Sequence, residues 1–158
     1  MTTKRTLAVG AGITAIAATV TTPLLAGTAA ASRTQSFTLR MHAVSETTVD
    51  NDKSGFSAGD VDVQTSRLTK GGSAVGYEVG DCLTTRVAKT ADQLCHFVFH
   101  LHKGQIVAVG AVRAGQSGPG TFTLAITGGT DTYAAARGEV SITATRGGSV
   151  PAEIDIRY

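Results

Sequence analysis

Two cysteines are the residues of this 158-residue chain best suited to covalent chemistry. Cys82 and Cys95 are thirteen positions apart and lie on neighbouring predicted strands. If the turn between those strands centres on Ala88 and Lys89, the two cysteines lie directly opposite each other, with Cβ atoms within about 5 Å. That separation suits a disulfide. A disulfide at this place and a free, reactive thiol exclude each other.

Three of the four histidines form the second group with chemical potential. His96, His100 and His102 share one face of a predicted strand, while His42 lies elsewhere. Six residues of extended strand span about 20 Å, so one metal ion cannot join His96 to His102. No metal-binding motif accompanies them, and we expect no metal site. The histidines either lie on a solvated face or, if that face points inward, act as acid–base groups near neutral pH.

The composition and the remaining motifs exclude several classes of function. A formal net charge of +2 without basic clusters argues against nucleic acid binding, which requires a positively charged surface. Pro119 replaces the last glycine of a serine-hydrolase turn in the run that begins at Gly115. Residues 32–158 hold neither a phosphate-binding loop nor a dinucleotide-binding motif. We therefore expect no cofactor and no nucleic acid partner.

Residues 1–31 have the pattern of a secretory signal peptide. Lys4 and Arg5 form a basic start, residues 7–25 are apolar and uncharged, and residues 29–31 form an A-x-A cleavage site. The alternative is a membrane anchor, because the apolar stretch approaches spanning length. The glycine and threonine content and the A-x-A ending favour cleavage. We predict a secreted protein, without a stable membrane anchor, that folds from residues 32–158. Two of the 14 basic residues fall in the leader, so 12 remain against 12 acidic ones.

Residues 32–158 alternate polar and apolar side chains with period two and show no sustained helical spacing. Glycine-rich turns separate the alternating segments, and residues 44–59 read as an irregular polar loop. This spacing predicts an all-β domain, either a closed barrel or a sandwich. Eight segments are predicted to be strands: Phe37–Ala43, Asp60–Thr69, Ala74–Val87, Leu94–His102, Gln105–Arg113, Thr121–Thr127, Glu139–Thr145 and Glu153–Tyr158.

Two of these predicted strands, Leu94–His102 and Gln105–Arg113, carry apolar side chains on both faces. A half-buried strand of an antiparallel sheet would have one polar face. Something therefore covers the outer face of these strands. A partner subunit is one interpretation, and a packed loop or the N-terminal arm is the other.

Three motifs in order resemble the allene oxide cyclase and dirigent superfamily. Residues Ala125–Tyr133 (A-I-T-G-G-T-D-T-Y), with Ala136–Val140 after them, resemble that superfamily's A-I-T-G-G-[ST]-G-x-[FY] turn and the strand that follows it. Ala58–Val61 with Thr65–Leu68 is similar to the G-D-L-x-x-x-T-N-K-L segment of the cyclases. Val75–Cys82 is similar to their V-G-x-x-x-G-x-C segment. Together the motifs cover nearly all of residues 32–158.

The resemblance implies a single antiparallel eight-stranded β-barrel, often trimeric, whose lumen takes a hydrophobic small molecule. The cyclases close an unstable epoxide into a ring without a cofactor. Dirigent proteins steer the stereochemistry of radical coupling. For this chain the resemblance therefore implies a cofactor-free, stereoselective cyclase or isomerase, a small hydrophobic substrate and a homotrimer.

The resemblance also selects candidate catalytic residues. Ala43 falls where the cyclases have a catalytic glutamate, Ser45 falls where they have an asparagine, and Glu46 lies nearby. Cys82 matches their lumen cysteine and would then be a free thiol. Asp60 or Ser45 is expected to polarise an oxygen, and Arg137 to stabilise developing negative charge. The predicted catalytic residues are therefore Ser45, Asp60, Cys82 and Arg137.

Four residues in and after the turn motif carry structural expectations. Gly128 and Gly129 permit positive φ at a tight turn. The family's next glycine is replaced by Asp131, one of the few residue types that tolerate the left-handed region. Arg137 either pairs with an acid in the barrel or lies on the surface.

Three functional hypotheses follow. The first is the cyclase or isomerase, in which a shaped pocket holds one conformer of a reactive substrate. The second is a secreted protein that binds a small molecule without bond chemistry, which the missing glutamate favours. The third is a structural or interaction protein whose interior is filled by its own side chains: Phe97, Phe99, Phe122 and Ile126.

Overall fold

The computed structural model describes residues 34–51, 57–115, 120–143 and 150–157. The described residues fall in one compact unit, residues 31–158, separate from residues 1–30. The predicted signal peptide lies outside the described residues, so its cleavage stays a prediction. Within the described ranges, no helix is long and apolar enough to span a bilayer.

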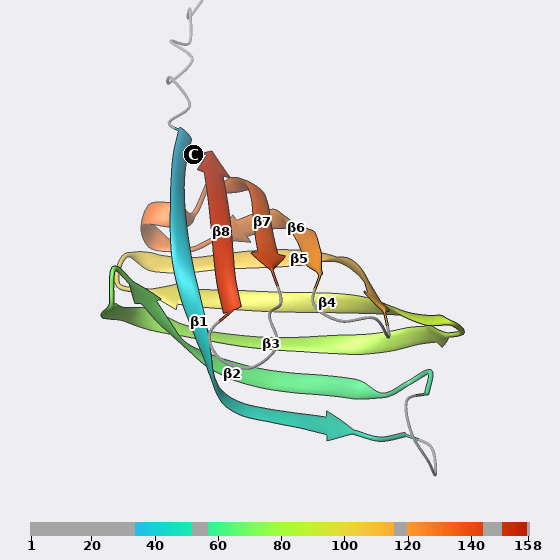
Figure 1. The fold of residues 1–158 in the computed structure, drawn as a ribbon. Helices are drawn as coiled ribbons and strands as arrows, with labels where there is room; N and C mark the ends of the chain where they lie inside the picture. Colours follow the sequence, from blue (N-terminus) through green and yellow to red (C-terminus); the bar gives the residue numbers. More distant parts are fainter. Residues whose placement is uncertain (1–33, 52–56, 116–119, 144–149, 158) are drawn as a thin grey trace, which may run out of the picture. The chain divides into compact units, whose positions relative to one another are not determined.

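The described residues form antiparallel strands and one short 3₁₀ helix, η1 (Figure 1). This result confirms the all-β prediction. The strands are β1 Thr34–Val49, β2 Val61–Lys70, β3 Ser73–Val87, β4 Thr90–Leu101, β5 Gly104–Gly115, β6 Thr121–Gly129, β7 Arg137–Thr143 and β8 Val150–Arg157, and η1 is Asp131–Tyr133.

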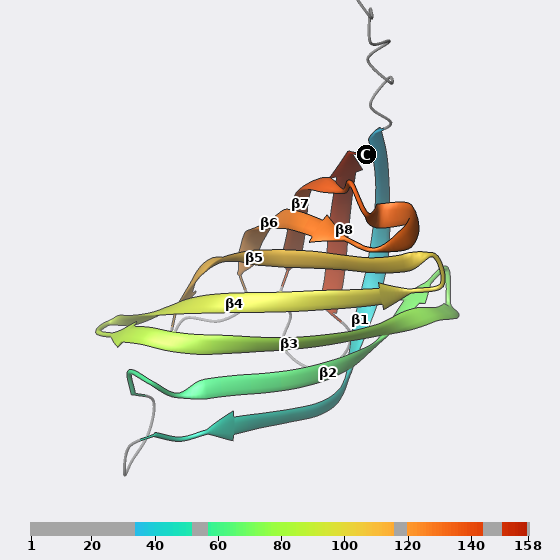
Figure 2. The ribbon, with the colours of Figure 1, turned by 180° about the vertical axis from the view of Figure 1, so that it is seen from behind.

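The sheet curls until its two edges meet. Each strand pairs antiparallel with the next, and β8 pairs with β1, so the described strands form a closed barrel. β1 serves both edges because it bends: Thr34–Met41 pair with β8, and the second half turns away to run beside β2 (Figures 1 and 2). The pairing is not complete along every strand, since residues 42–49 of β1 pair with β2 alone among the described residues.

The first strand is longer than the sequence predicts. Residues 44–49, expected in a polar loop, continue β1, and Ser45–Val49 pair with Val61–Thr65 of β2. A β-bulge between Ala43 and Ser45 breaks the alternation, because a bulge adds one residue that has no partner on the other strand. The polar composition hid this strand, and pairing with β2 overrides local propensity.

The glycine pair of the turn motif was expected within a tight turn, but it lies at the end of a strand. Gly128 and Gly129 end β6, and the chain turns after them through η1. Gly129 is required by close approach, since an added Cβ would lie 2.1 Å from the backbone oxygen of Gln105. Asp131 has φ 50°, which confirms the expected left-handed residue. Tyr133 is buried and anchors the turn on the core.

Inward-facing side chains of β4 to β7 make most of the core, together with Leu39 and Met41 of β1 and Leu68 of β2. Along β4 every second residue is buried, which is the period of a half-buried strand. Phe97 lies 6.5 Å from Phe99 and 6.4 Å from Phe122 between ring centroids, so the rings form one aromatic cluster. Side chains that share this side of the sheet are called the inner face below.

Candidate functional site on the inner face

Directly opposed residues in an antiparallel ladder share a face, so the register defines cross-strand rows on the inner face. Each row begins with polar or small residues on β1 to β3 and ends with apolar ones on β4 to β6. The first row is Ala43, Ser66, Glu78, Phe99 and Ile106; the second is Glu46, Gln64, Gly80, Phe97, Ala108 and Ile126; the third is Thr48, Asp62, Cys82, Cys95 and Gly110.

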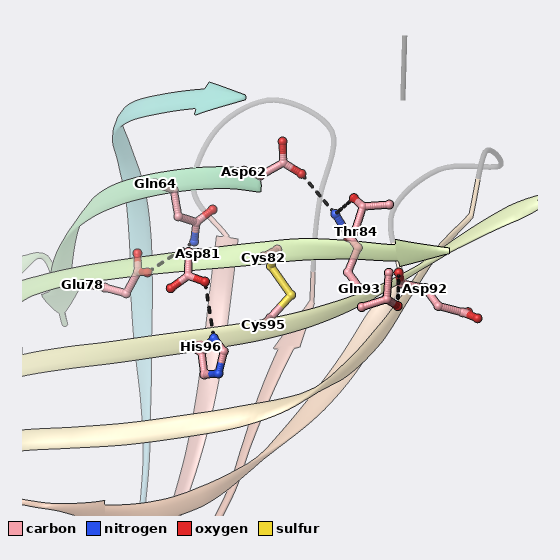
Figure 3. The surroundings of a disulfide bond; sticks show 11 residues. Asp62, Gln64, Glu78, Asp81, Cys82, Thr84, Asp92, Gln93, Cys95 and His96 are labelled. Carbon is pink, nitrogen blue, oxygen red and sulfur yellow. Dashed lines mark hydrogen bonds and ion pairs between the residues drawn. A yellow bond between two sulfur atoms is a disulfide. The ribbon is translucent and has the colours of Figure 1, made fainter. Parts of the chain in front are cut away.

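Glu78 of β3 is the acid at the centre of this face. Its side chain is fully buried, at 0% exposure. Gln64 donates a hydrogen bond from Nε2 to Oε1 at 3.4 Å, whereas Oε2 has no hydrogen-bond partner among the described residues (Figure 3). Burial raises the pKa of Glu78 from 4.5 to about 6, against the opposing effect of the nearby Ser66 hydroxyl and of the Gln64 amide. Glu78 is therefore an acid that changes protonation close to neutral pH.

Gly80 makes room for this carboxyl group. A Cβ added at Gly80 would lie 2.6 Å from Oε1 of Glu78 and 2.5 Å from the ring of Phe97. The glycine therefore lets the carboxyl group lie close to the aromatic cluster. A carboxylic acid beside apolar rings is poorly solvated, which is the physical cause of its raised pKa.

The two cysteines form the disulfide that the hairpin argument predicts. Cys82 and Cys95 are opposed on β3 and β4 with Cα atoms 4.1 Å apart, and they are bonded (Figure 3). A register shift between Thr84 and Arg86 brings them opposite each other. The expectation of Cys82 as a catalytic thiol is therefore corrected, because a disulfide sulfur carries no thiolate.

A polar cluster adjoins the disulfide on the inner face. Asp62 accepts a hydrogen bond from Thr48 Oγ1 at 2.6 Å. It accepts a second one from Gln93 Nε2 at 3.0 Å (Figure 3). Gln93 also lies 3.4 Å from Thr84 Oγ1, and Thr84 is buried. The cluster fixes the Asp62 carboxyl group beside Cys82.

Ser45 lies on the wrong side of the sheet for its predicted role. The bulge in β1 places Ser45 opposite Thr65, which pairs with the exposed Val79 on the outer face. The same bulge turns Glu46 to the inner face, opposite Gln64. The expected positions of Ala43 and Ser45 assume an unbroken strand, and a shift of one residue moves the following side chains to the opposite face.

Asp60 is buried but engaged in holding the chain before β2. Its carboxylate accepts hydrogen bonds from the Asn51 backbone N–H at 3.0 Å, from the Ser57 backbone N–H at 2.6 Å, and from Ser57 Oγ at 2.9 Å. These bonds lower its pKa, the Asn51 and Ser57 backbone donors most. Its geometry is that of a loop anchor.

Arg137 is exposed at the start of β7, where Nη1 donates to the Ala136 carbonyl oxygen at 2.6 Å. Within the described residues it forms no ion pair. When the cross-strand pairs are followed from strand to strand, Asp60 falls in the same row as Val112 of β5. Arg137 falls in the row of Val107. Those β5 positions are about 17 Å apart. The four predicted residues are therefore not brought together.

The histidines of β4 point away from the inner face. His96 Nδ1 lies 3.3 Å from Asp81 Oδ2 (Figure 3), and the His100 ring stacks on Tyr77 with centroids 4.7 Å apart. His102 lies exposed at the β4–β5 turn. In the described part of the chain, no three His, Cys, Asp or Glu side chains are placed to hold a metal ion.

Sequence reasoning missed Glu78, although a signal for it existed. The residue stands at an unspecified position of the Val75–Cys82 motif. Period-two alternation places Gly76, Glu78 and Gly80 on the same face as Cys82. Once Cys82 is assigned to the interior, the same alternation predicts that Glu78 also faces the interior.

The closed ring of antiparallel strands has the fold of small β-barrels of the allene oxide cyclase and dirigent type. Comparison with solved structures confirms this resemblance. A pyocyanin demethylase matches with a TM-score of 0.69 and 29% identity over 77% of this chain and 99% of its own. No model of a known protein family matches the sequence, and no curated protein does.

Two other solved structures share the fold at lower identity. An exo-specific intermolecular Diels-Alderase matches with a TM-score of 0.65 and 14% identity over 80% of this chain and 99% of its own. A pterocarpan synthase dirigent protein matches with a TM-score of 0.59 and 16% identity over 79% of this chain and 94% of its own. At such identities the likeness is one of fold alone.

Proposed function

We propose that this chain is a secreted barrel that binds a small hydrophobic molecule on its inner face and catalyses a cofactor-free isomerisation or cyclisation with Glu78 as the proton-transfer group. The observation that carries the proposal is the Oε2 atom of Glu78, which is buried and has no hydrogen-bond partner among the described residues, while Oε1 of the same carboxyl group lies beside Phe97 over Gly80. A buried polar atom without a partner is costly, and a ligand group that hydrogen-bonds to it would remove that cost.

The chemistry follows from the protonation state of Glu78. With a pKa of about 6, both protonation states are accessible near neutral pH, as an acid–base catalyst requires. The carboxylate takes a proton from one atom of the substrate, the π electrons shift, and the acid returns the proton to another atom. Substrate and product then have the same composition, so no oxidant or cofactor is required. The apolar rings position the substrate for this exchange.

The similar proteins support this class of activity. Their descriptions name a demethylase, a Diels-Alderase and a pterocarpan synthase dirigent protein, and each description concerns a reaction of a small organic molecule. The disulfide is consistent with folding in an oxidising compartment, which supports the proposed secretion.

We propose further that the outer face of β2 to β5 joins copies of the chain, as the resemblance to trimeric barrels implies. Val63, Val79, Leu83 and Leu94 are exposed there, each at 36–40% of its surface. The ladder places Leu83 directly opposite Leu94, so that the patch crosses from β3 to β4. The Asp81–His96 pair lies on the same face between the rows of Val79 and Leu83. Exposed apolar side chains gathered around polar ones in this way are typical of an interface. Native mass spectrometry of the protein would show trimers, and Leu94→Glu would leave monomers; a monomeric wild type would contradict the trimer.

A model proton abstraction tests the catalytic role without knowledge of the natural substrate. A carboxylate that removes the ring C–H proton of 5-nitrobenzisoxazole breaks its N–O bond and forms a coloured phenolate, with no cofactor. We expect saturable acceleration whose rate rises with pH through about 6. Glu78→Gln should lower it by about 100-fold, while Glu139→Gln, an exposed acid of β7, should not. A rate retained in Glu78→Gln would contradict the role of Glu78.

The alternative is binding without turnover, and the absence of a glutamate at Ala43 is the observation in its favour. Native mass spectrometry of protein from its own secretion medium distinguishes binding from a filled interior. Retained small-molecule mass without acceleration of the model reaction would support the non-catalytic barrel. A bare protein that takes up no apolar ligand would support the structural alternative.

A further inference from the structure

The charge on the inner face is of one sign among the described side chains. The three cross-strand rows hold Glu46, Asp62 and Glu78, and they hold no Lys, Arg or His. Lys70 is the described basic side chain that reaches an inward residue, with Nζ 5.1 Å from the Phe37 ring centroid. It lies at the β2–β3 turn, four residues of β2 beyond Ser66, or about 13 Å along the strand.

The acids have no cationic partner within the rows. Gln64 satisfies Oε1 of Glu78, and Thr48 and Gln93 satisfy Asp62, all through neutral groups. Oε2 of Glu78 is fully buried and unpartnered among the described residues. Glu78 is buried, whereas Asp62 is half-buried and Glu46 is exposed. Buried charges in proteins are normally paired, so Glu78 lacks a positive partner that a ligand can supply.

The opposite ends of the same rows are aromatic. Phe99 is the direct neighbour of Glu78 across β3 and β4, and Phe97 lies beside the carboxyl group over Gly80. Aromatic faces attract cations through their quadrupole, most strongly where water is excluded. Carboxylates and rings therefore favour the same kind of ligand.

We infer that the ligand of the inner face is a planar, largely apolar molecule that carries a positively charged or protonated nitrogen, which pairs with Oε2 of Glu78 while its ring system packs on Phe97 and Phe99. The inference rests on the proposed function, since it assumes that the inner face admits a ligand. It narrows the substrate class from hydrophobic molecules in general to cationic heteroaromatic compounds and aromatic amines.

Three probes of equal size and different charge test this selectivity. N-methylquinolinium is a permanent cation, quinoline is neutral at about pH 8, and 1-naphthoate is an anion. At about pH 8 Glu78 is ionised, because its pKa is about 6. Isothermal titration calorimetry should show N-methylquinolinium binding about ten-fold or more tightly than quinoline, with 1-naphthoate weakest. The cation-to-neutral ratio should fall several-fold in Glu78→Gln and in Asp62→Asn.

Glu139→Gln is the matched control, because it removes the same charge from an exposed position on β7 and should keep the wild-type ratio. Quinoline or 1-naphthoate binding as tightly as the cation would overturn the charge selectivity and leave the ligand-binding barrel intact. A ratio that falls equally in Glu139→Gln would overturn the assignment to the inner face. Failure of all three probes to bind the wild type would contradict the proposed function as well.

Discussion

The amide of Gln64 holds one oxygen of Glu78 and leaves the other without a partner. Nε2 of Gln64 donates to Oε1 at 3.4 Å from the neighbouring strand β2, whereas Oε2 meets no donor among the described residues. One oxygen is thus held in place, while the other is buried without a partner. A ligand group that reached Oε2 would supply the missing hydrogen bond, and Gln64 would keep the carboxyl group oriented for proton transfer.

The raised pKa of Glu78 predicts a specific loss of stability with rising pH. Because its pKa rises from 4.5 in the unfolded chain to about 6 in the native state, the native state holds the proton more tightly. The free energy of unfolding should therefore fall by about 2 kcal/mol between pH ~4.5 and pH ~6 through this group alone. Urea unfolding with the disulfide intact should show this fall as a difference between the wild type and Glu78→Gln. Parallel pH profiles of the two proteins would contradict it.

Gly80→Ala tests whether the Glu78 carboxyl group and the Phe97 ring pack so closely that no side chain fits at position 80. The added Cβ would meet Phe97 at 2.5 Å and Oε1 at 2.6 Å, so that the ring or the carboxyl group must move. We expect a loss of about 1–3 kcal/mol in the free energy of unfolding, as for other overpacked cores. Gly120→Ala, where nothing lies within 4 Å of the new Cβ, should be close to neutral. Equal effects of both substitutions would argue against the close approach.

The disulfide should contribute to stability and leave the chemistry unchanged. It closes a loop between residues thirteen apart on β3 and β4, so replacement of both Cys82 and Cys95 by alanine should cost about 3 kcal/mol. A reductant should lower the stability of the wild type by a similar amount and leave the double variant unaffected. Acceleration of 5-nitrobenzisoxazole by the folded double variant should persist; its loss would return a chemical role to Cys82.

Asp60 is predicted to act on the chain before β2 and not on a ligand. Asp60→Ala removes the acceptor of two backbone N–H groups, so hydrogen exchange at Asn51 and Ser57 should become faster. Ser57→Ala removes only the hydroxyl donor and should have a smaller effect. Binding of quinoline should stay unchanged in both variants. Weakened binding together with unchanged exchange would support the original catalytic expectation for Asp60.

Much of the fold was predictable because period-two alternation and glycine turns are local signals. The strands around Phe97 and Phe122 follow this pattern, and so does the opposed pair of cysteines. The second half of β1 was not predictable in this way, since its polar residues do not alternate with apolar ones. It forms through hydrogen bonds to β2, which only the folded barrel supplies.

The candidate site was predicted less well, because it depends on which face each side chain takes. Ser45 lies outside the barrel as a result of a single bulged residue, and Arg137 lies about 17 Å along the barrel from Asp60. The alternation of β3 was sufficient to place Glu78 beside Cys82 on one face. Its burial and its unpartnered oxygen, however, depend on Phe97, Gly80 and Gln64 packing together.

The most direct test of the account is a titration of the Glu78 carboxyl group by NMR, with carbon-labelled glutamate and with Glu78→Gln to assign the signal. The account predicts a pKa of about 6 in the free protein. It also predicts that saturating N-methylquinolinium shifts the signal and lowers this pKa, because a bound cation favours the charged carboxylate. A signal that titrates near the ordinary value of 4.5 and does not respond to the probe would contradict the assignment of Glu78 as the reactive group of a ligand-binding barrel.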